Sequence, residues 1–443
     1  MTLAPMPPAE PLLGHARVLA RDPLATLTRW MHEYGPVVRF RVGRREAHVV
    51  FSREAIRRVL SDPDAIYGKD THGYRTLRTF VGDGLLTSGG DLWVRQRRLL
   101  QPAFHRGCVA AQVATMSEIA GQAGDAMAAT SGEVRVDAVA MGATLDVVGR
   151  TLFRADLRGR EGDIASAITT LQVAANRRIA ASVVLPISWP TPGHQRIRAA
   201  RARLVAILDA LLADDRPTDD ARPSAIDLLR AARDERGRPL ARGLIHDELI
   251  TLLIAGHEST ANALAWTLVL LGRHPSKVRW LREELDAVVG TGPVEAGHLP
   301  ALVRARAVVD ESLRLYPPAW SFGRAPTRDD VIEGFTVPRG GLVMIVPWAT
   351  HRDRAVFPAP EAFEPERFVG SEPPPFAFLP FGGGAHTCIG QGLARTEACV
   401  MIATWLRDLD FELTPGQRLD PEPLITLRPP AGVRMRVTRR STR

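Results

Sequence analysis

One cysteine lies in a setting that suits metal chemistry. Cys388 closes the stretch Phe381-Gly-Gly-Gly-Ala-His-Thr-Cys388-Ile-Gly390, just before a predicted helix. Consecutive glycines permit backbone angles and close approaches that side chains forbid, and a helix N-terminus favours a thiolate. His386 alone does not complete the spacing of a zinc site. A single thiolate on such a loop suits the axial position of a haem iron.

A second candidate is an acid within the most apolar stretch of the chain. Glu258 follows Ala255 and Gly256 and precedes Ser259 and Thr260. One reading is a buried acid paired for structure. The other is a proton carrier, because burial makes a carboxyl usable for that purpose. The small residues would leave room for a diatomic ligand, and the hydroxyls could bridge a broken backbone hydrogen bond.

These motifs resemble those of the cytochrome P450 family. Phe381-x-x-Gly384-x-His386-x-Cys388-x-Gly390 resembles its haem-binding loop. Four more matches follow the family's order; they are Trp93-x-x-x-Arg97, Ala255–Thr260, Glu311-x-x-Arg314 with Tyr316-Pro317-Pro318, and Phe363–Phe368 with Arg367. The resemblance covers essentially the whole chain. It implies the P450 fold and haem b, which is iron protoporphyrin IX.

The resemblance also implies roles for single residues. Cys388 is expected to be the axial iron ligand, in a loop that brings Phe381, Gly382 and Gly390 to the cofactor. The residues expected near the haem propionates are Trp93, Arg97, Arg324 and His386, the last at a position where the family often has Arg. Ala255 and Gly256 are expected to border the haem.

Three residues of the central helix are expected to be catalytic, namely Glu258, Ser259 and Thr260. The family usually has Thr where this chain has Ser259, which lacks the methyl that stiffens χ1; Thr260 could share the role. Glu311 and Arg314 are either a surface pair or, as the resemblance implies, part of a buried structural network with Arg367.

The implied activity is that of a haem-thiolate monooxygenase, which inserts one oxygen atom from O2 into a small apolar substrate. Terpenoid, fatty-acid and polyketide-like substrates stay open. Electrons are expected from a separate ferredoxin or flavodoxin with its NAD(P)H-dependent reductase, because 55 residues follow Cys388, too few for a flavin or iron–sulfur domain. A peroxide-driven peroxygenase is an alternative that the Glu258-Ser259 pair argues against. A non-catalytic haem- or lipid-binding protein is another, and it predicts loss of the acid or the thiolate.

The resemblance places two surfaces as well. The substrate pocket is expected between Tyr67–Leu86, Thr251–Ala255 and Ala319–Phe322, with the aromatics of the third segment either in the pocket or in the core. The electron donor is expected to dock on a basic patch; its members are Arg95, Arg98, Arg106 and Arg395. The alternative is four solvated arginines.

Composition narrows the class of protein. The 443 residues are 45% hydrophobic and 24% charged, with a net charge of +8, an ordinary globular balance. Arginine supplies 55 of the 57 cations, and its even spread among acids argues against nucleic-acid binding. Three cysteines, Cys108, Cys388 and Cys399, favour a reducing compartment. No targeting segment is apparent, and the polar centre of Leu249–Leu271 argues against a membrane span, so a cytoplasmic protein is expected.

The elements that must position these residues are mainly helical, with small β-sheets, in one domain over residues 1–443. A β-rich N-terminal part is expected at about 23–55, a helical core at about 56–316 and 388–410, and a C-terminal hairpin at about 424–438. The long central helix is predicted from near Asp247 to Arg273, where His274-Pro275 ends it.

Overall fold

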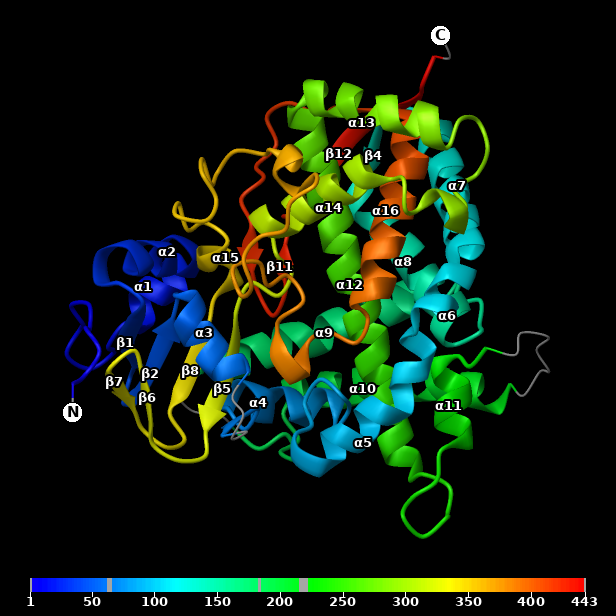
Figure 1. Cartoon of the computed structure of the whole chain (residues 1–443). Helices are drawn as coiled ribbons and strands as arrows, with labels where there is room; N and C mark the ends of the chain where they lie inside the picture. Colours follow the sequence, from blue (N-terminus) through cyan, green and yellow to red (C-terminus); the bar gives the residue numbers. More distant parts are fainter. Residues whose placement is uncertain (1, 62–65, 182–184, 215–221, 442–443) are drawn as a thin grey trace.

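The computed structural model describes residues 2–61, 66–181, 185–214 and 222–441. Helices and small sheets segregate within it (Figure 1). The sheet that contains β1, β2, β5 and β8 lies at the N-terminal side, and α7, α8, α12, α14 and α16 gather at the other. The architecture is mainly helical, as predicted.

The helices in the first half of the chain are α1 (Ala16–Arg21), α2 (Pro23–Tyr34), α3 (Arg53–Leu60), α4 (His72–Val81), α5 (Gly90–Leu100), α6 (Arg106–Ala111), α7 (Val113–Ala129), α8 (Val136–Leu152), α9 (Glu161–Ala180) and α10 (Pro192–Ala213). Those in the second half are α11 (Ala225–Ala231), α12 (Arg242–Arg273), α13 (Pro275–Val288), α14 (Val303–Leu315), α15 (Pro347–Thr350) and α16 (Gln391–Asp408). None of the described helices combines the length and apolar character that crossing a bilayer requires.

The strands are short, and most pair across long stretches of sequence. They are β1 (Val37–Val42), β2 (Arg45–Val50), β3 (Tyr67–Gly68), β4 (Glu133–Arg135), β5 (Phe322–Pro326), β6 (Asp330–Ile332), β7 (Phe335–Val337), β8 (Leu342–Ile345), β9 (Leu409–Leu413), β10 (Glu422–Pro423), β11 (Leu427–Arg428) and β12 (Arg434–Arg439). The largest sheet has the order β1-β2-β8-β5-β3. Its β1–β2 hairpin lies within the β-rich N-terminal part that was expected at about 23–55.

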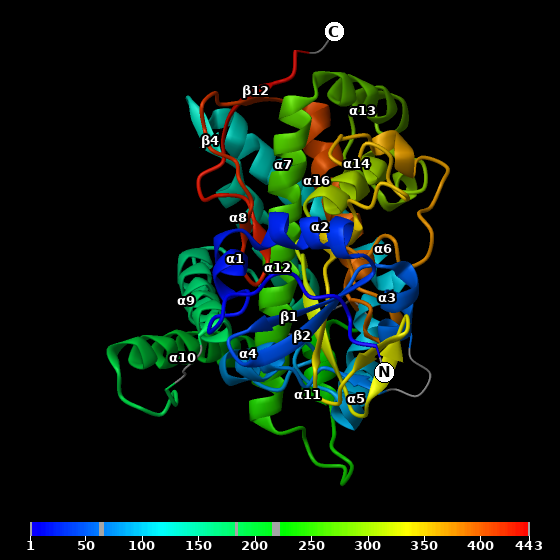
Figure 2. The same ribbon diagram turned by 90° about the vertical axis from the view of Figure 1, so that its left-hand side faces the viewer.

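Helix α12 is the central element. It packs against α8, α10, α14 and α16, and in Figure 2 α9 and α10 lie together to one side of it. Most of its residues from Glu248 to Leu271 are buried, the polar Glu258 and Thr260 among them, as is typical of a helix inside a large core. It begins at Arg242, one turn before the predicted Asp247. That extra turn is polar, and Arg242 and His246 hold it by pairing with Asp209 of α10 at 2.8 and 2.6 Å.

The predicted C-terminal hairpin at about 424–438 is wrong. Strand β11 lies in its first part and pairs with β10, which precedes residue 424. Strand β12 pairs instead with β9 and β4. Alternation identified β12 as a strand, but strands far apart in the chain supply its partners, and alternation carries no information about pairing.

Candidate functional site

The loop that carries Cys388 is a tight turn sealed by its own backbone. The Cys388 N–H donates to the Phe381 carbonyl at 2.9 Å, and the Thr387 N–H donates to Gly384 at 3.1 Å. Helix α16 begins three residues later at Gln391, as predicted. The thiol therefore stands where a helix start meets a closed turn.

Gly384 explains why this loop needs glycine. Its φ is +66°, and a Cβ there would stand 1.9 Å from the Leu60 carbonyl oxygen of α3. Any side chain would push the loop away from α3. The glycine thus sets how close the Cys388 turn lies to the N-terminal part of the chain.

The Cys388 side chain is accessible although protein surrounds it. Burial raises the pKa of its thiol, while the Gly390 N–H and the Arg97 charge oppose that rise. The side chain is thus exposed and yet surrounded by protein. Both observations hold if the exposed face of Cys388 borders an internal space. Ala255 indicates the same, because it is exposed in the middle of α12 although Leu253 and His257, two residues away on either side, are buried. A metal at this space would displace the proton and bind the thiolate.

A cluster of cations lies beside this loop. The Arg97 Nη1 donates to the Thr387 carbonyl at 2.7 Å, and Arg324 is only 4% exposed. The rings of Trp93 and His386 are 4.0 Å apart. Burial, followed by the charges of Lys69, Arg324 and Arg97, lowers the pKa of His386 to about 3. All four residues expected near the propionates are therefore together.

Lys69 is a fifth member that the sequence reasoning missed. Its Nζ donates to the carbonyls of Leu85 and Leu86 at 3.0 and 3.1 Å. Burial, then Arg324 and Arg97, lower its pKa to about 7, and Glu248 opposes them. The sequence did offer a signal for this residue, because Lys69 is one of only two lysines in a chain whose other cations are arginines.

The cluster fits the anionic edge of a haem. Lys69, Arg97 and Arg324 repel one another in a buried setting, and two carboxylates would neutralise that charge. The His386 Nδ1 is buried and has no hydrogen-bond partner among the described residues, so an added carboxylate could satisfy it. Cations on one side and a thiolate-forming Cys388 on the other suit a propionate-bearing iron porphyrin.

The hydroxyls of α12 are used within the helix. Ser259 Oγ donates to the Ala255 carbonyl at 2.7 Å, and Thr260 Oγ1 donates to Gly256 at 3.3 Å. Helix α12 is continuous from Arg242 to Arg273, so the expected break in its backbone bonding is absent. A Cβ on Gly256 would meet Val148 of α8 at 2.9 Å. Close packing of the two helices thus accounts for this glycine, and the exposed Ala255 beside it borders the internal space.

Glu258 is enclosed by partners that the sequence reasoning missed. Its side chain is about 1% exposed, and its Oε1 accepts from Thr426 Oγ1 at 2.6 Å and from Arg428 Nε at 2.7 Å. Its Oε2 accepts from the Gln172 amide of α9. Arg428 lies in β11 and is half-buried. The sequence reasoning treated this segment only as part of an alternating strand and did not single out its cation. The acid is therefore both paired for structure and close to Ser259.

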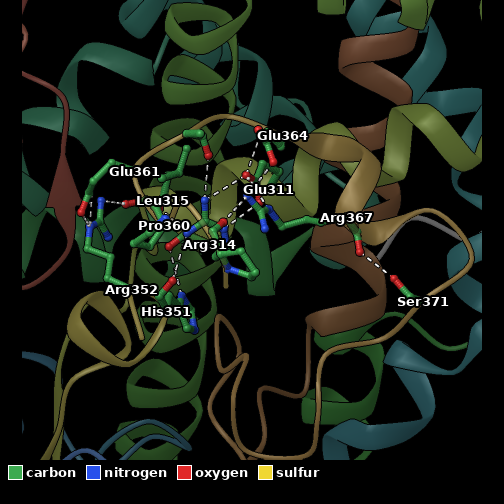
Figure 3. A network of polar contacts seen from close by, with 12 residues as sticks. Glu311, Arg314, Leu315, His351, Arg352, Pro360, Glu361, Glu364, Arg367 and Ser371 are labelled. Atoms are coloured by element: carbon green, nitrogen blue, oxygen red, sulfur yellow. Dashed lines mark hydrogen bonds and ion pairs between the residues drawn. The ribbon is translucent and has the colours of Figure 1, made fainter. Parts of the chain in front are cut away.

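Glu311, Arg314 and Arg367 form the buried network implied by the resemblance (Figure 3). Arg314 donates to both oxygens of Glu311 at 2.7 and 2.9 Å, and Arg367 Nε donates to Glu311 at 3.1 Å. Both members of the Glu311–Arg314 pair are fully buried, so the surface-pair reading is wrong.

This network reaches the Cys388 loop through His351. The Arg314 Nη1 donates to the His351 carbonyl at 3.0 Å, and the Leu379 N–H donates to His351 Nε2 at 2.8 Å. Burial lowers the pKa of His351 to about 3, so the ring is neutral and can accept. Leu379 lies two residues before Phe381, so the network anchors the start of the loop.

The first expected wall of the pocket contacts the two elements that carry the other walls. Strand β3 pairs with β5, and the Asp83 and Leu85 N–H groups donate to Asp247 and Glu248 of α12 at 2.9 and 3.0 Å. The aromatics of the third wall have core contacts: Trp320 donates to the Leu424 carbonyl at 2.8 Å, and Phe322 packs on the core beside β8. The core reading of these aromatics is the better supported.

The expected basic patch is half neutralised. Arg95 pairs with Glu235 at 3.0 Å, and Arg395 pairs with the buried Asp310 at 3.0 Å. Arg98 and Arg106 are exposed. A docking surface here would depend mainly on these last two residues.

Comparison with known proteins agrees with this geometry. The family model of cytochrome P450 matches residues 4–435, and the chain belongs to that family. Cyclooctatin synthase of Streptomyces melanosporofaciens is 33% identical over 95% of this chain and 92% of its own. Cyclooctat-9-en-7-ol 5-monooxygenase of the same organism is 34% identical over 94% and 91%. Pentalenene oxygenase of Streptomyces avermitilis is 32% identical over 98% and 97%.

Family membership defines the class of enzyme. The chain is an oxidoreductase that incorporates oxygen, with a haem-iron cofactor, O2 and a redox partner.

Proposed function

We propose that this chain is a haem-thiolate monooxygenase that inserts one oxygen atom from O2 into a small apolar substrate, with Cys388 as the axial ligand of haem b. The single observation that carries the proposal is the Cys388 turn, whose accessible thiol faces inward beside the Lys69, Arg97, Arg324 and His386 cluster. The haem supplies the activation of O2 when it is bound.

The chain's own residues have three tasks in this proposal. Cys388 binds the iron, and the cation cluster with Trp93 holds the propionates. Glu258 carries protons from solvent toward Ser259, whose hydroxyl hands its own proton on, with Thr260 as a second hydroxyl. The short distance along α12 supports this order, although Ser259 donates to Ala255 in the resting chain. The electrons come from a ferredoxin or flavodoxin with its NAD(P)H-dependent reductase.

We place terpenoids first among the substrates. The names of the relatives, which include pentalenene oxygenase and cyclooctat-9-en-7-ol 5-monooxygenase, support this order. Titration of terpenoids, fatty acids and polyketides against the loaded protein, followed as a shift of the Soret band, tests it. A shift with fatty acids alone would contradict the order.

The ferrous–CO spectrum tests the proposal itself. Cys388→Ser should abolish the far-red-shifted Soret band, whereas Cys108→Ser should keep it as a matched cysteine control. If the band persisted in Cys388→Ser, the ligand assignment would be wrong. Turnover with peroxide alone, at a rate equal to that with O2 and a donor, would favour the peroxygenase alternative.

A further inference from the structure

A groove lies between α12, α13, α16, β9 and β12, at the end of the molecule where Figures 1 and 2 show α13 and β12 together. Its volume is about 300 Å³, which is at the lower limit of small-molecule sites. We call it the β9 groove. Its apolar lining includes Leu268, Leu271, Val278, Leu406 and Phe411, and its charged rim consists of Arg279, Arg282, Asp410, Glu412 and Arg436.

The β9 groove is separate from the site around Cys388. Leu406 lies 15 residues after Gln391, the first residue of α16, which corresponds to about 22 Å along a helix. On α12, Leu268 lies 13 residues after Ala255, or about 20 Å. A molecule in the β9 groove would therefore not touch the residues that are expected to border the haem.

The apolar lining suits a hydrocarbon chain. Leu268, Leu271 and Leu406 are each about 1% exposed and form the core beneath the groove. Val278 of α13 and Phe411 of β9 are half-buried, so part of each side chain stays open to a ligand. Removal of such apolar surface from water favours binding in proportion to the area that is covered.

Two of the three cations on the rim already have acidic neighbours. Arg282 pairs with Asp410 at 2.8 Å. It also donates to two backbone carbonyls where α16 meets β9, at 2.9 and 2.6 Å, so its guanidinium is fixed in place. Arg436 lies 3.9 Å from Glu412, and both side chains are exposed. The acids therefore stand on the β9 side of the groove, where they disfavour a second negative charge.

The third cation, Arg279, stands on the α13 side and has no counter-charge. It is exposed, and no acidic side chain within the described part of the chain pairs with it. Glu283, one helical turn further on, pairs with Arg304 instead, at 2.9 Å. The first turn of α13 contains no acidic residue either. Val278 and Arg282 line the groove from the same helix, so the free guanidinium borders the apolar surface.

We propose that the β9 groove binds a medium-chain carboxylic acid, with the hydrocarbon chain against the apolar lining and the carboxylate at Arg279. Charge complementarity selects an anion, because the rim carries three cations and two acids. A neutral chain would leave Arg279 unpaired, and a cation would be repelled by it. Binding involves no covalent step, and the inference does not depend on the proposed oxygenation.

Photolabelling tests the location. The reagent is octanoate that carries a diazirine, and the haem-loaded protein is labelled in the presence of saturating 4-phenylimidazole, which ligates the haem iron and blocks the substrate pocket. We expect labels on residues 268–282, 406–412 and 436–438, and excess octanoate should remove them. Labels elsewhere only, or labels that octanoate does not displace, would overturn the proposal.

Titrations followed by ligand-detected NMR, with the same blocked protein, test the role of the charge. Octanoate should bind with a Kd of about 1 mM, as the affinity per atom of small ligands implies. Arg279→Gln should weaken this binding about two- to fivefold, as expected for an ion pair at an exposed rim, whereas Arg279→Lys should keep most of it. Arg44→Gln, which changes an exposed arginine in the β1–β2 turn, is the matched control and should bind like wild type.

The neutral analogue 1-octanol separates the chain from the charge. It should bind wild type more weakly than octanoate does, and Arg279→Gln should leave its affinity unchanged. Equal affinity of the two ligands for wild type would refute the carboxylate site, as would equal octanoate affinity of Arg279→Gln and wild type.

A blocking variant provides an independent test. Thr438 is an exposed residue of β12 that lines the groove, so Thr438→Trp can cover the groove from outside without entering the core. It should weaken octanoate binding about tenfold or more, because the indole takes the apolar surface that the chain would cover. Thr130→Trp, at the exposed end of α7, should have no effect. Unchanged binding in a Thr438→Trp protein of wild-type Tm would contradict the proposal.

Discussion

Replacement of Glu311 should destabilise the protein more than replacement of an exposed acid of the same network. Glu311→Gln keeps the shape of the side chain but leaves the Arg314 guanidinium, which is 0% exposed, without its counter-charge. Removal of one partner from a buried pair costs about 3–5 kcal/mol. With an unfolding entropy of about 2.1 cal/mol/K per residue, the 443-residue chain should lose about 3–5 °C in Tm.

The assay is thermal unfolding of the haem-loaded protein, followed by both circular dichroism and the Soret band. The matched control is Glu364→Gln, because Glu364 accepts from Arg367 in the same network at 3.2 Å but is 53% exposed. Exposed pairs are worth about 0–1 kcal/mol, so this variant should lose about 1 °C or less. Equal losses in the two variants, or a Glu311→Gln protein within a degree of wild type, would refute the reasoning.

Three further predictions concern the loop, the cation cluster and the donor surface. Gly384→Ala should lower the free energy of unfolding by at least about 1–3 kcal/mol and should lower haem retention, because the new Cβ would lie 1.9 Å from the Leu60 carbonyl oxygen. The control is Gly392→Ala in α16, where a Cβ would meet no atom within 4 Å. This variant should be neutral or slightly stabilising. The haem-free chain should have a stability minimum near pH 7. The pKa of Glu248 is raised from 4.5 to about 7, so this acid lowers the free energy of unfolding as the pH rises from 4.5 to 7. The pKa of Lys69 is lowered from 10.5 to about 7, so this amine raises the free energy of unfolding as the pH rises from 7 to 10.5. Denaturation at pH 5, 7 and 9 measures this profile. The change in stability between pH 5 and 7 should become smaller in Glu248→Gln, and the change between pH 7 and 9 should become smaller in Lys69→Met. An unchanged profile in both variants would contradict the prediction. Arg98→Glu should slow the transfer of the first electron at low salt. The difference from wild type should disappear above about 0.1 M salt, where the Debye length is about 10 Å. Equal slowing in the control Arg44→Glu, on the β1–β2 hairpin, would place the docking surface elsewhere.

Local patterns in the sequence were sufficient for the family and for most elements. The Phe381–Gly390 motif depends on residues adjacent in the chain, so the turn before α16 could be predicted directly. The same holds for the end of α12 at His274-Pro275, because a proline restricts the residue before it. The start of α12 was missed because its first turn is polar, and contacts with Asp209 stabilise that turn.

What the sequence by itself determined was the set of groups that the chain carries and the elements that present them: a thiol at a helix start, an acid inside a buried helix, and a Glu-x-x-Arg pair. What only the tertiary structure decided was which distant residues meet them. Arg428 reaches Glu258 across 170 positions, Lys69 joins Arg97, Arg324 and His386, and β12 chooses β9 and β4 instead of a neighbouring strand. Periodicity states which face of an element is buried, but not which other element covers that face. The partners of the buried charged groups therefore became visible only when the chain was folded.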